Sequence, residues 1–317
     1  MNYQEFCEYI KENIKEYLPE RYQNREVKLK TTIKNNEVEK CGLMLDDPSQ
    51  TLSPVLYLEG AFNLYKKGQS LDVICDYIAD QYQEARMNPA IADIDFEKFD
   101  AIKDMILPIV VSAKENKNQL SNKPHQYLDD LVVMYQVEID NTRDEVGTVA
   151  VNNKLMKIWN VSGEEIHQKA LENQKEKYPA ELCKMEELLF GNPENFLLNE
   201  DGKQPEPEGM YVLKTSRNVY GAAAIADKEI MEQVAQTFND DYVILPSSIH
   251  ECIILPQQAL TNMGFTPKEL GKMVREVNNN EVSKEERLSD HIYRYSKEDK
   301  VLEGVRESKN RNKEMER

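Results

Sequence analysis

Two residues in the last third of the chain have the side chains that nucleophilic catalysis needs. Ser248 and His250 are two positions apart. On an extended segment such residues project to the same side, so a hydroxyl and an imidazole would stand side by side, as in half of a catalytic triad. Glu251 would project to the other side. The alternative is a polar turn between two strands, in which serines such as Ser247 bond to backbone groups and the histidine lies at the surface. We favour the turn and assign no catalytic residue.

A second segment, residues 278–295, holds a dense mixture of ionisable side chains, and an arginine of the same set precedes it. Alternation over residues 292–295 indicates a strand whose tyrosines flank charged positions. We interpret the segment as a surface ion-pair network with a tyrosine-lined edge, and the alternative is a ligand or partner site. Its candidate residues are Arg275, Arg287, Asp290, His291 and Arg294.

Fingerprints of cofactor and metal enzymes are missing from the sequence. There is no G-x-G-x-x-G, no phosphate-binding loop and no G-x-S-x-G. No two of the four histidines have the spacing that would place both on one helix face. Glu164 and His167 could share one helix face, but a carboxylate-bridged metal site needs that motif twice, so we interpret the pair as a solvated helix face. We predict no cofactor and no metal site.

The acidic balance of the chain excludes some classes of partner. Its 317 residues include 57 acidic and 40 basic side chains, a formal charge of −17. Nonspecific nucleic-acid binding needs clustered lysine and arginine, so we do not expect it. No apolar stretch approaches the roughly 18 residues that span a bilayer, and the first twenty residues do not resemble a signal peptide. The five cysteines are odd in number and form no C-x-x-C pair, which favours a cytoplasmic protein.

Hydrophobic periodicity predicts helices and hairpins in irregular alternation. Capping boxes at Ser162 and Thr266 mark two helix starts, and Pro108 makes its own segment an edge strand or a kinked element. Without repeating strand–helix units, the fold class is α+β, with mixed or mostly antiparallel sheets and helices packed on them, and neither a Rossmann fold nor a TIM barrel. The predicted helices span about 3–17, 55–67, 70–85, 162–177, 227–238 and 266–277. The predicted strands span about 27–33, 38–45, 105–111, 131–139, 145–151, 210–215, 219–226, 242–245 and 252–255.

Loop chemistry suggests where the chain divides. Periodicity fades over residues 179–209, where glycine and proline cluster, so this stretch is a linker or an insertion. It separates an N-terminal α+β region, residues 1–178, from a C-terminal α+β region, residues 210–302. Residues 303–317 are charged without apolar periodicity, which predicts a disordered tail.

Several stretches of the sequence also carry a resemblance. Residues 241–256, 274–278 and 286–295 are similar to those of DUF5688, a bacterial family of unknown function found in Clostridia and often on mobile elements. Weaker matches lie at residues 115–117 and 124–125. The resemblance extends to about Tyr295, although Asn279-Asn280 departs from the pattern.

Membership of that family implies a cytoplasmic accessory protein and no particular activity. It nominates the same loop that the residues themselves indicate, namely Ser247, Ser248, His250 and Glu251. Our leading hypothesis is a noncatalytic protein that binds an unknown protein or small molecule, as an accessory factor of a mobile genetic element. The alternative is a hydrolase or transferase that uses Ser248 and His250 with Asp290 or His291. A third hypothesis, a DNA-associated accessory factor, is opposed by the charge.

Overall fold

The structure is a computed structural model that describes residues 1–46, 53–86, 94–141, 146–191, 193–198, 205–217 and 219–305. The chain divides into two compact units. Unit 1 comprises Met1–Lys103 and Glu138–Thr148, and unit 2 comprises Asp104–Val137 and Val149–Arg317.

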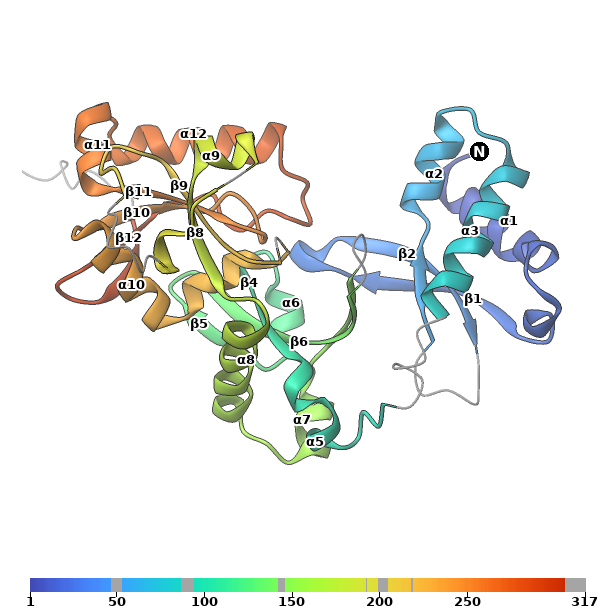
Figure 1. Cartoon of the computed structure of the whole chain (residues 1–317). Helices are drawn as coiled ribbons and strands as arrows, with labels where there is room; N and C mark the ends of the chain where they lie inside the picture. The colour runs from blue at the N-terminus through green and yellow to red at the C-terminus, as the bar shows by residue number, and fades with distance from the viewer. Residues whose placement is uncertain are drawn as a thin grey trace, which may run out of the picture. The chain divides into compact units, whose positions relative to one another are not determined.

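Unit 1 packs helices against a three-stranded antiparallel sheet of order β1-β2-β3 (Figure 1). Its core forms where the apolar faces of α1 and α3 meet Leu43 and Leu45 of β2, and each of these two leucines is at most 1% exposed. The elements are α1 (Tyr3–Asn13), β1 (Glu26–Ile33), β2 (Glu39–Asp46), β3 (Val55–Tyr57), α2 (Glu59–Lys66), α3 (Leu71–Arg86) and α5 (Phe99–Ile102).

A smaller sheet lies mainly in unit 2, although residues 138–141 at the end of one of its strands and residues 146–148 of the next are counted in unit 1. It has the order β4-β6-β5, with β7 paired to β6, and α8 packs on β4. Pro108 lies on β4, an edge strand, where a residue without an N–H is tolerated. The elements are β4 (Ile106–Ser112), α6 (Lys117–Leu120), β5 (Gln126–Leu128), β6 (Leu131–Asn141), β7 (Val146–Ala150), α7 (Asn153–Trp159) and α8 (Gly163–Lys177).

A six-stranded sheet of order β13-β12-β10-β11-β9-β8 carries the rest of unit 2. Its elements are β8 (Ala180–Lys184), α9 (Met185–Phe190), β9 (Tyr211–Thr215), the 3-10 helix η6 (Gly221–Ala226), α10 (Lys228–Phe238), β10 (Tyr242–Leu245), β11 (Cys252–Pro256), α11 (Gln257–Met263), α12 (Pro267–Asn280), β12 (Tyr293–Ser296) and β13 (Val301–Gly304).

Strand alternation explains why helices cover both faces of the larger sheet. Val243 and Leu255, which are register partners on β10 and β11, share a buried cluster with Leu270 and Val274 of α12. The neighbouring Tyr242 points to the other face, where its hydroxyl donates to the carbonyl of Met231 on α10. The period of two therefore sends alternate side chains to helices on opposite faces.

The α+β class is confirmed, and the strand pairs whose registers are defined are antiparallel. Both predicted capping boxes are present, at Ser162 before α8 and at Thr266 before α12. Asp227 caps α10 by accepting a hydrogen bond from the backbone of Glu229. These elements have local signals, which sequence periodicity captures well.

Two predicted elements were wrong. Residues 55–67 are not one helix, because β3 precedes α2 and pairs with β2, where Gly42 leaves room for the side chain of Val55. Residues 219–226 are not a strand but contain η6, a 3-10 helix. There the backbone of Gly221 approaches the carbonyl of His250 so closely that a Cβ would lie 2.5 Å from it. Small side chains serve this backbone contact, and a run of alanine has little strand propensity.

The segments expected to be irregular hold some structure. Residues 179–209 contribute β8 and α9 to unit 2, while residues 192 and 199–204 lie outside the described residues. Glu303 and Gly304, expected to begin the tail, belong to β13 and pair with β12. Residues 306–317 lie outside the described residues.

Candidate functional site

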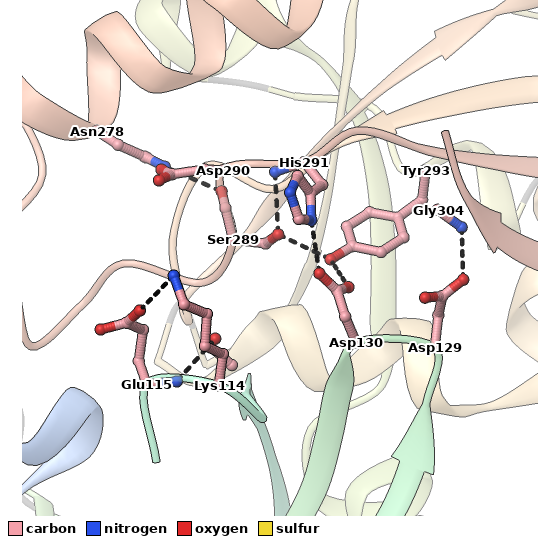
Figure 2. Close-up of polar contacts among 11 residues, drawn as sticks. Lys114, Glu115, Asp129, Asp130, Asn278, Ser289, Asp290, His291, Tyr293 and Gly304 are labelled. Carbon is pink, nitrogen blue, oxygen red and sulfur yellow. Dashed lines mark hydrogen bonds and ion pairs between the residues drawn. The ribbon is translucent and has the colours of Figure 1, made fainter. Parts of the chain in front are cut away.

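One connected polar cluster of unit 2 centres on Asp130. We call Asp130, Ser289, His291 and Tyr293 the Asp130 cluster. The Asp130 carboxylate lies 2.6 Å from Nδ1 of His291 and 2.5 Å from the Tyr293 hydroxyl, which is also 2.8 Å from Ser289 Oγ (Figure 2). Ser289 Oγ in turn accepts a hydrogen bond from the backbone N–H of His291. The Asp130 carboxylate therefore forms hydrogen bonds with an imidazole and a phenol that lie more than 150 residues later in the chain.

A two-residue turn places Asp130. Leu128, the last residue of β5, pairs with Leu131, the first residue of β6, and Asp129 between them has φ +56°, a left-handed conformation that aspartate tolerates. Asp129 Oδ2 accepts the N–H of Gly304 on β13 at 2.8 Å. Figure 2 shows both carboxylates projecting from this turn toward the β12–β13 region. The turn thus joins the smaller sheet of unit 2 to the edge of the larger one.

The two ends of the cluster differ in exposure. Tyr293 is fully buried, and burial together with the hydrogen bond to Asp130 raises the pKa of Tyr293 far above its usual range. The side chain of His291 is 62% exposed. Because Nδ1 faces a carboxylate, the proton of a neutral ring lies on Nδ1 and Nε2 is left as the basic nitrogen. An imidazole oriented in this way by a carboxylate can act as a general base or bind a hydrogen-bond donor.

Asp290, one residue before His291, faces a different partner. Its Oδ1 accepts a hydrogen bond of 2.8 Å from Nδ2 of Asn278, which also donates to the carbonyl of Ser289. Asn278 is buried on α12, so it fixes the backbone just before β12. Asp290 therefore connects the segment before β12 to α12, while His291 connects it to the turn that holds Asp130.

His250 belongs to a second arrangement. Its ring stacks on Tyr220 with the centroids 5.8 Å apart, and Nδ1 accepts the backbone N–H of Tyr220 at 3.2 Å. Nε2 lies 3.7 Å from a carboxylate oxygen of Glu286. Because Nδ1 accepts a hydrogen bond, the proton of a neutral ring is on Nε2, and the basic nitrogen is already occupied.

The residues around His250 form a tight turn. Ser248 Oγ accepts the backbone N–H of His250 at 3.0 Å, and the Ser248 N–H donates to the carbonyl of Glu251. Ser247 and the side chain of Glu251 are half-buried. The two segments singled out from the sequence do meet, but at Glu286, whose carbonyl accepts the N–H of Ile249 at 2.9 Å.

The three candidate arginines lie around this region in different roles. Arg294, exposed on β12, lies 2.6 Å from Asp241. A backbone hydrogen bond from Lys297 and this guanidinium together lower the pKa of Asp241. Arg287 donates through Nε to the carbonyl of Val282, and Arg275 is half-buried on α12.

Sequence reasoning missed the partners of both histidines. Asp130, Tyr220 and Glu286 are distant in sequence from the rings that they contact or are separated from them by a turn. Only Asp129-Asp130 carried a signal, since two acidic residues between apolar strands indicate a hairpin turn. Within the described residues, no group of three or more His, Cys, Asp or Glu side chains could hold a metal ion. No described helix has both the length and the apolar character needed to cross a membrane.

Comparison with known proteins gives a family and no activity. The sequence model of DUF5688, a family of unknown function, matches residues 3–297. No curated protein matches the chain. No solved structure matches it either.

Proposed function

We propose that the chain, which belongs to the DUF5688 family of unknown function, is a noncatalytic protein that binds another protein through an exposed apolar surface of unit 2. The observation that carries this proposal is a pair of side chains at the end of α9. Leu189 is 81% exposed and Phe190 is 87% exposed. Large apolar side chains exposed side by side on a water-soluble surface are a feature of protein interaction sites.

The setting of the pair supports a protein partner with basic groups. Glu186 and Glu187 lie in the first turn of α9, and the whole chain has a formal charge of −17. Such a field speeds the approach of a positively charged surface and repels acidic ones. We therefore assign to the partner an apolar surface bordered by lysine or arginine.

Two polar residues singled out from the sequence support a noncatalytic role, because their side chains already make structural hydrogen bonds. Ser248 accepts a backbone hydrogen bond, and Nδ1 of His250 accepts another. The cytoplasmic location and the bacterial mobile-element setting belong to this proposal as well, and they are supported by the resemblance described above and by the cysteine content.

A photocrosslinking amino acid at position 190 tests the proposal directly. In cells, a variant carrying the crosslinker at Phe190 should give a discrete adduct with a basic protein, and Leu189→Ser in the same chain should abolish it. The matched control carries the crosslinker at Lys114, which lies outside α9 in the same unit and whose side chain is 90% exposed. The proposal fails if the two positions give the same adducts, or if neither gives one.

One observation favours a second candidate, a hydrolase or transferase. The His291–Asp130 pair has the orientation of a general base, with Nε2 toward the exposed side. Such an enzyme would depend on His291 rather than on the occupied Nδ1 of His250. Screening ester, amide and phosphoester substrates with the native chain and with His291→Asn tests it: an activity lost in that variant, without loss of folding, would support catalysis.

A further inference from the structure

Two cysteines of unit 1 meet in the core between α1 and the three-stranded sheet. Cys7 is buried on the inner face of α1. Cys41 lies on β2, where the period of two places it on the same face as Leu43 and Leu45, which pack in that core. Both cysteines carry free thiols. The fold therefore brings together two thiols that are 34 residues apart in the sequence.

The two thiols are in contact, and they differ in exposure. A hydrogen bond joins the thiol group of Cys7 to that of Cys41. Cys7 is 2% exposed, whereas Cys41 is half-buried. A reagent in solution therefore reaches Cys41 more readily than Cys7. In a pair of this kind the accessible thiol reacts first, and the buried thiol then attacks it to close a disulfide.

Glu59, the first residue of α2, makes both thiols harder to ionise. Its Oε1 accepts the backbone N–H of Cys41 at 3.2 Å. Burial and the charge of this carboxylate raise the pKa of Cys41, while burial and the hydrogen bond with Cys41 raise the pKa of Cys7 to about 12. Both thiols are therefore protonated at neutral pH. Because the thiolate is the nucleophile, the pair reacts slowly there and faster as the pH rises.

We propose that Cys7 and Cys41 form a redox modification site, at which a small-molecule disulfide such as oxidised glutathione converts the two thiols to an intramolecular disulfide. The Cys41 sulfur loses its proton and attacks one sulfur of the reagent, so a protein–glutathione disulfide forms and one glutathione leaves as a thiol. The Cys7 sulfur then attacks the Cys41 sulfur, and the second glutathione leaves with the remaining proton. Two protein thiols and one glutathione disulfide thus give one protein disulfide and two glutathione thiols.

The product ties the N-terminal helix α1 covalently to strand β2 of the sheet on which it packs. Reversible disulfides of this kind are the ones that occur in reducing compartments, where they serve redox sensing. The site lies in unit 1 and is independent of the protein-binding surface that we propose for unit 2.

Thiol mapping of the full native chain by mass spectrometry tests the proposal. The chain is incubated with oxidised glutathione at about pH 8.5, where more thiolate is present. It is then denatured, its free thiols are alkylated with N-ethylmaleimide, and its peptides are analysed without reduction. We expect a peptide pair joined through Cys7 and Cys41, with the other cysteines alkylated. Excess reduced glutathione should restore all five thiols.

Variants separate the two steps of the exchange. Cys7→Ala should accumulate glutathione on Cys41, because the thiol that displaces it is missing, and Cys41→Ala should leave the buried Cys7 unmodified. The matched control Cys75→Ala removes a fully buried thiol from the same core and should leave the link unchanged.

The rate of the exchange tests the effect of Glu59. Glu59→Gln keeps an oxygen that can accept the N–H of Cys41 but removes the charge, so the exchange at neutral pH should be faster by roughly two- to ten-fold. The proposal is overturned if the native chain treated with oxidised glutathione lacks the Cys7–Cys41 link, if glutathione remains on Cys41 in that chain, or if Cys75 is linked as often as Cys7. The native chain carries these three outcomes, so they do not depend on whether a variant folds.

Discussion

Removing the Asp130 carboxylate should destabilise unit 2 by a predictable amount. Asp130 accepts hydrogen bonds from the fully buried hydroxyl of Tyr293 and from the exposed ring of His291. A hydrogen bond to a charged group contributes about 1.5–3 kcal/mol, and an exposed ion pair adds at most about 1 kcal/mol. Asp130→Ala should therefore lower the free energy of unfolding by about 2–4 kcal/mol. For a unit of about 200 residues, this corresponds to a fall in thermal midpoint of roughly 5–15 °C.

The single tryptophan makes the assay specific to unit 2. Trp159 is 6% exposed and belongs to that unit, so its fluorescence during urea denaturation reports the unfolding of unit 2. A double-mutant cycle of Asp130→Ala with Tyr293→Phe then isolates the hydrogen bond between them, for which we expect a coupling of about 1–3 kcal/mol. The matched control is Asp104→Ala, which removes a 66% exposed carboxylate paired with Lys169 in the same unit. That variant should lose less than about 1 kcal/mol.

Two results would refute this reasoning. The first is a loss below about 1 kcal/mol for Asp130→Ala, which would mean that water replaces the carboxylate at no cost to the buried phenol. The second is a coupling near zero between Asp130 and Tyr293, which would show that the turn docks on β12 through other contacts. Either result would also mean that the turn at Asp129 and Asp130 does not hold the two sheets of unit 2 together.

Three further predictions concern pH and packing. Burial lowers the pKa of His167 below its usual 6.5, so on acidification the unfolded chain takes up a proton before the folded chain does. The free energy of unfolding, measured by urea titration, should therefore fall as the pH drops through 6.5. An equal fall in His167→Gln would contradict this. Gly221→Ala should lower the free energy of unfolding by about 1–3 kcal/mol or more in thermal denaturation, because the new Cβ would overlap the backbone carbonyl of His250. The control Gly163→Ala, with open space around it, should change that free energy by less than about 1 kcal/mol. Equal losses in the two variants would contradict the close approach of Gly221 to His250. Burial raises the pKa of Tyr242 and Tyr293 above 10, so above pH 10 the unfolded chain loses these protons more readily and the free energy of unfolding should fall. Tyr293→Phe should make this fall less steep when unfolding is followed by tyrosinate absorbance. An unchanged slope would contradict the prediction.

Local chemistry explains which elements the sequence could predict. The capping boxes at Ser162 and Thr266 follow from interactions within a few residues of the chain. Such signals do not depend on which strand lies next to which. Residues 55–57 were assigned to the following helix because β3 exists only through its pairing with β2, a contact that periodicity within one segment cannot reveal.

The candidate site was predicted only in part, for a related reason. The sequence pointed to His291 and to tyrosines alternating around it, and Tyr293 is buried as that alternation requires. Its acidic partner, however, is 161 residues away. The position of Asp130 depends on how the β5–β6 turn meets the β12–β13 edge, which is a property of sheet packing. Sequence spacing carries no record of that packing, so Asp130 was not among the candidate residues.

The contacts of His250 argue against catalysis by Ser248 and His250. A base made from Ser248 and His250 needs a basic ring nitrogen facing the hydroxyl. Nδ1 of His250 instead accepts the N–H of Tyr220, and Nε2 is directed to Glu286. The imidazole therefore holds Tyr220 in its left-handed conformation. On this reasoning, the loop that resembles half of a triad positions Tyr220, and His250→Ala should lower the free energy of unfolding by about 1 kcal/mol in urea denaturation, as expected for the loss of one hydrogen bond.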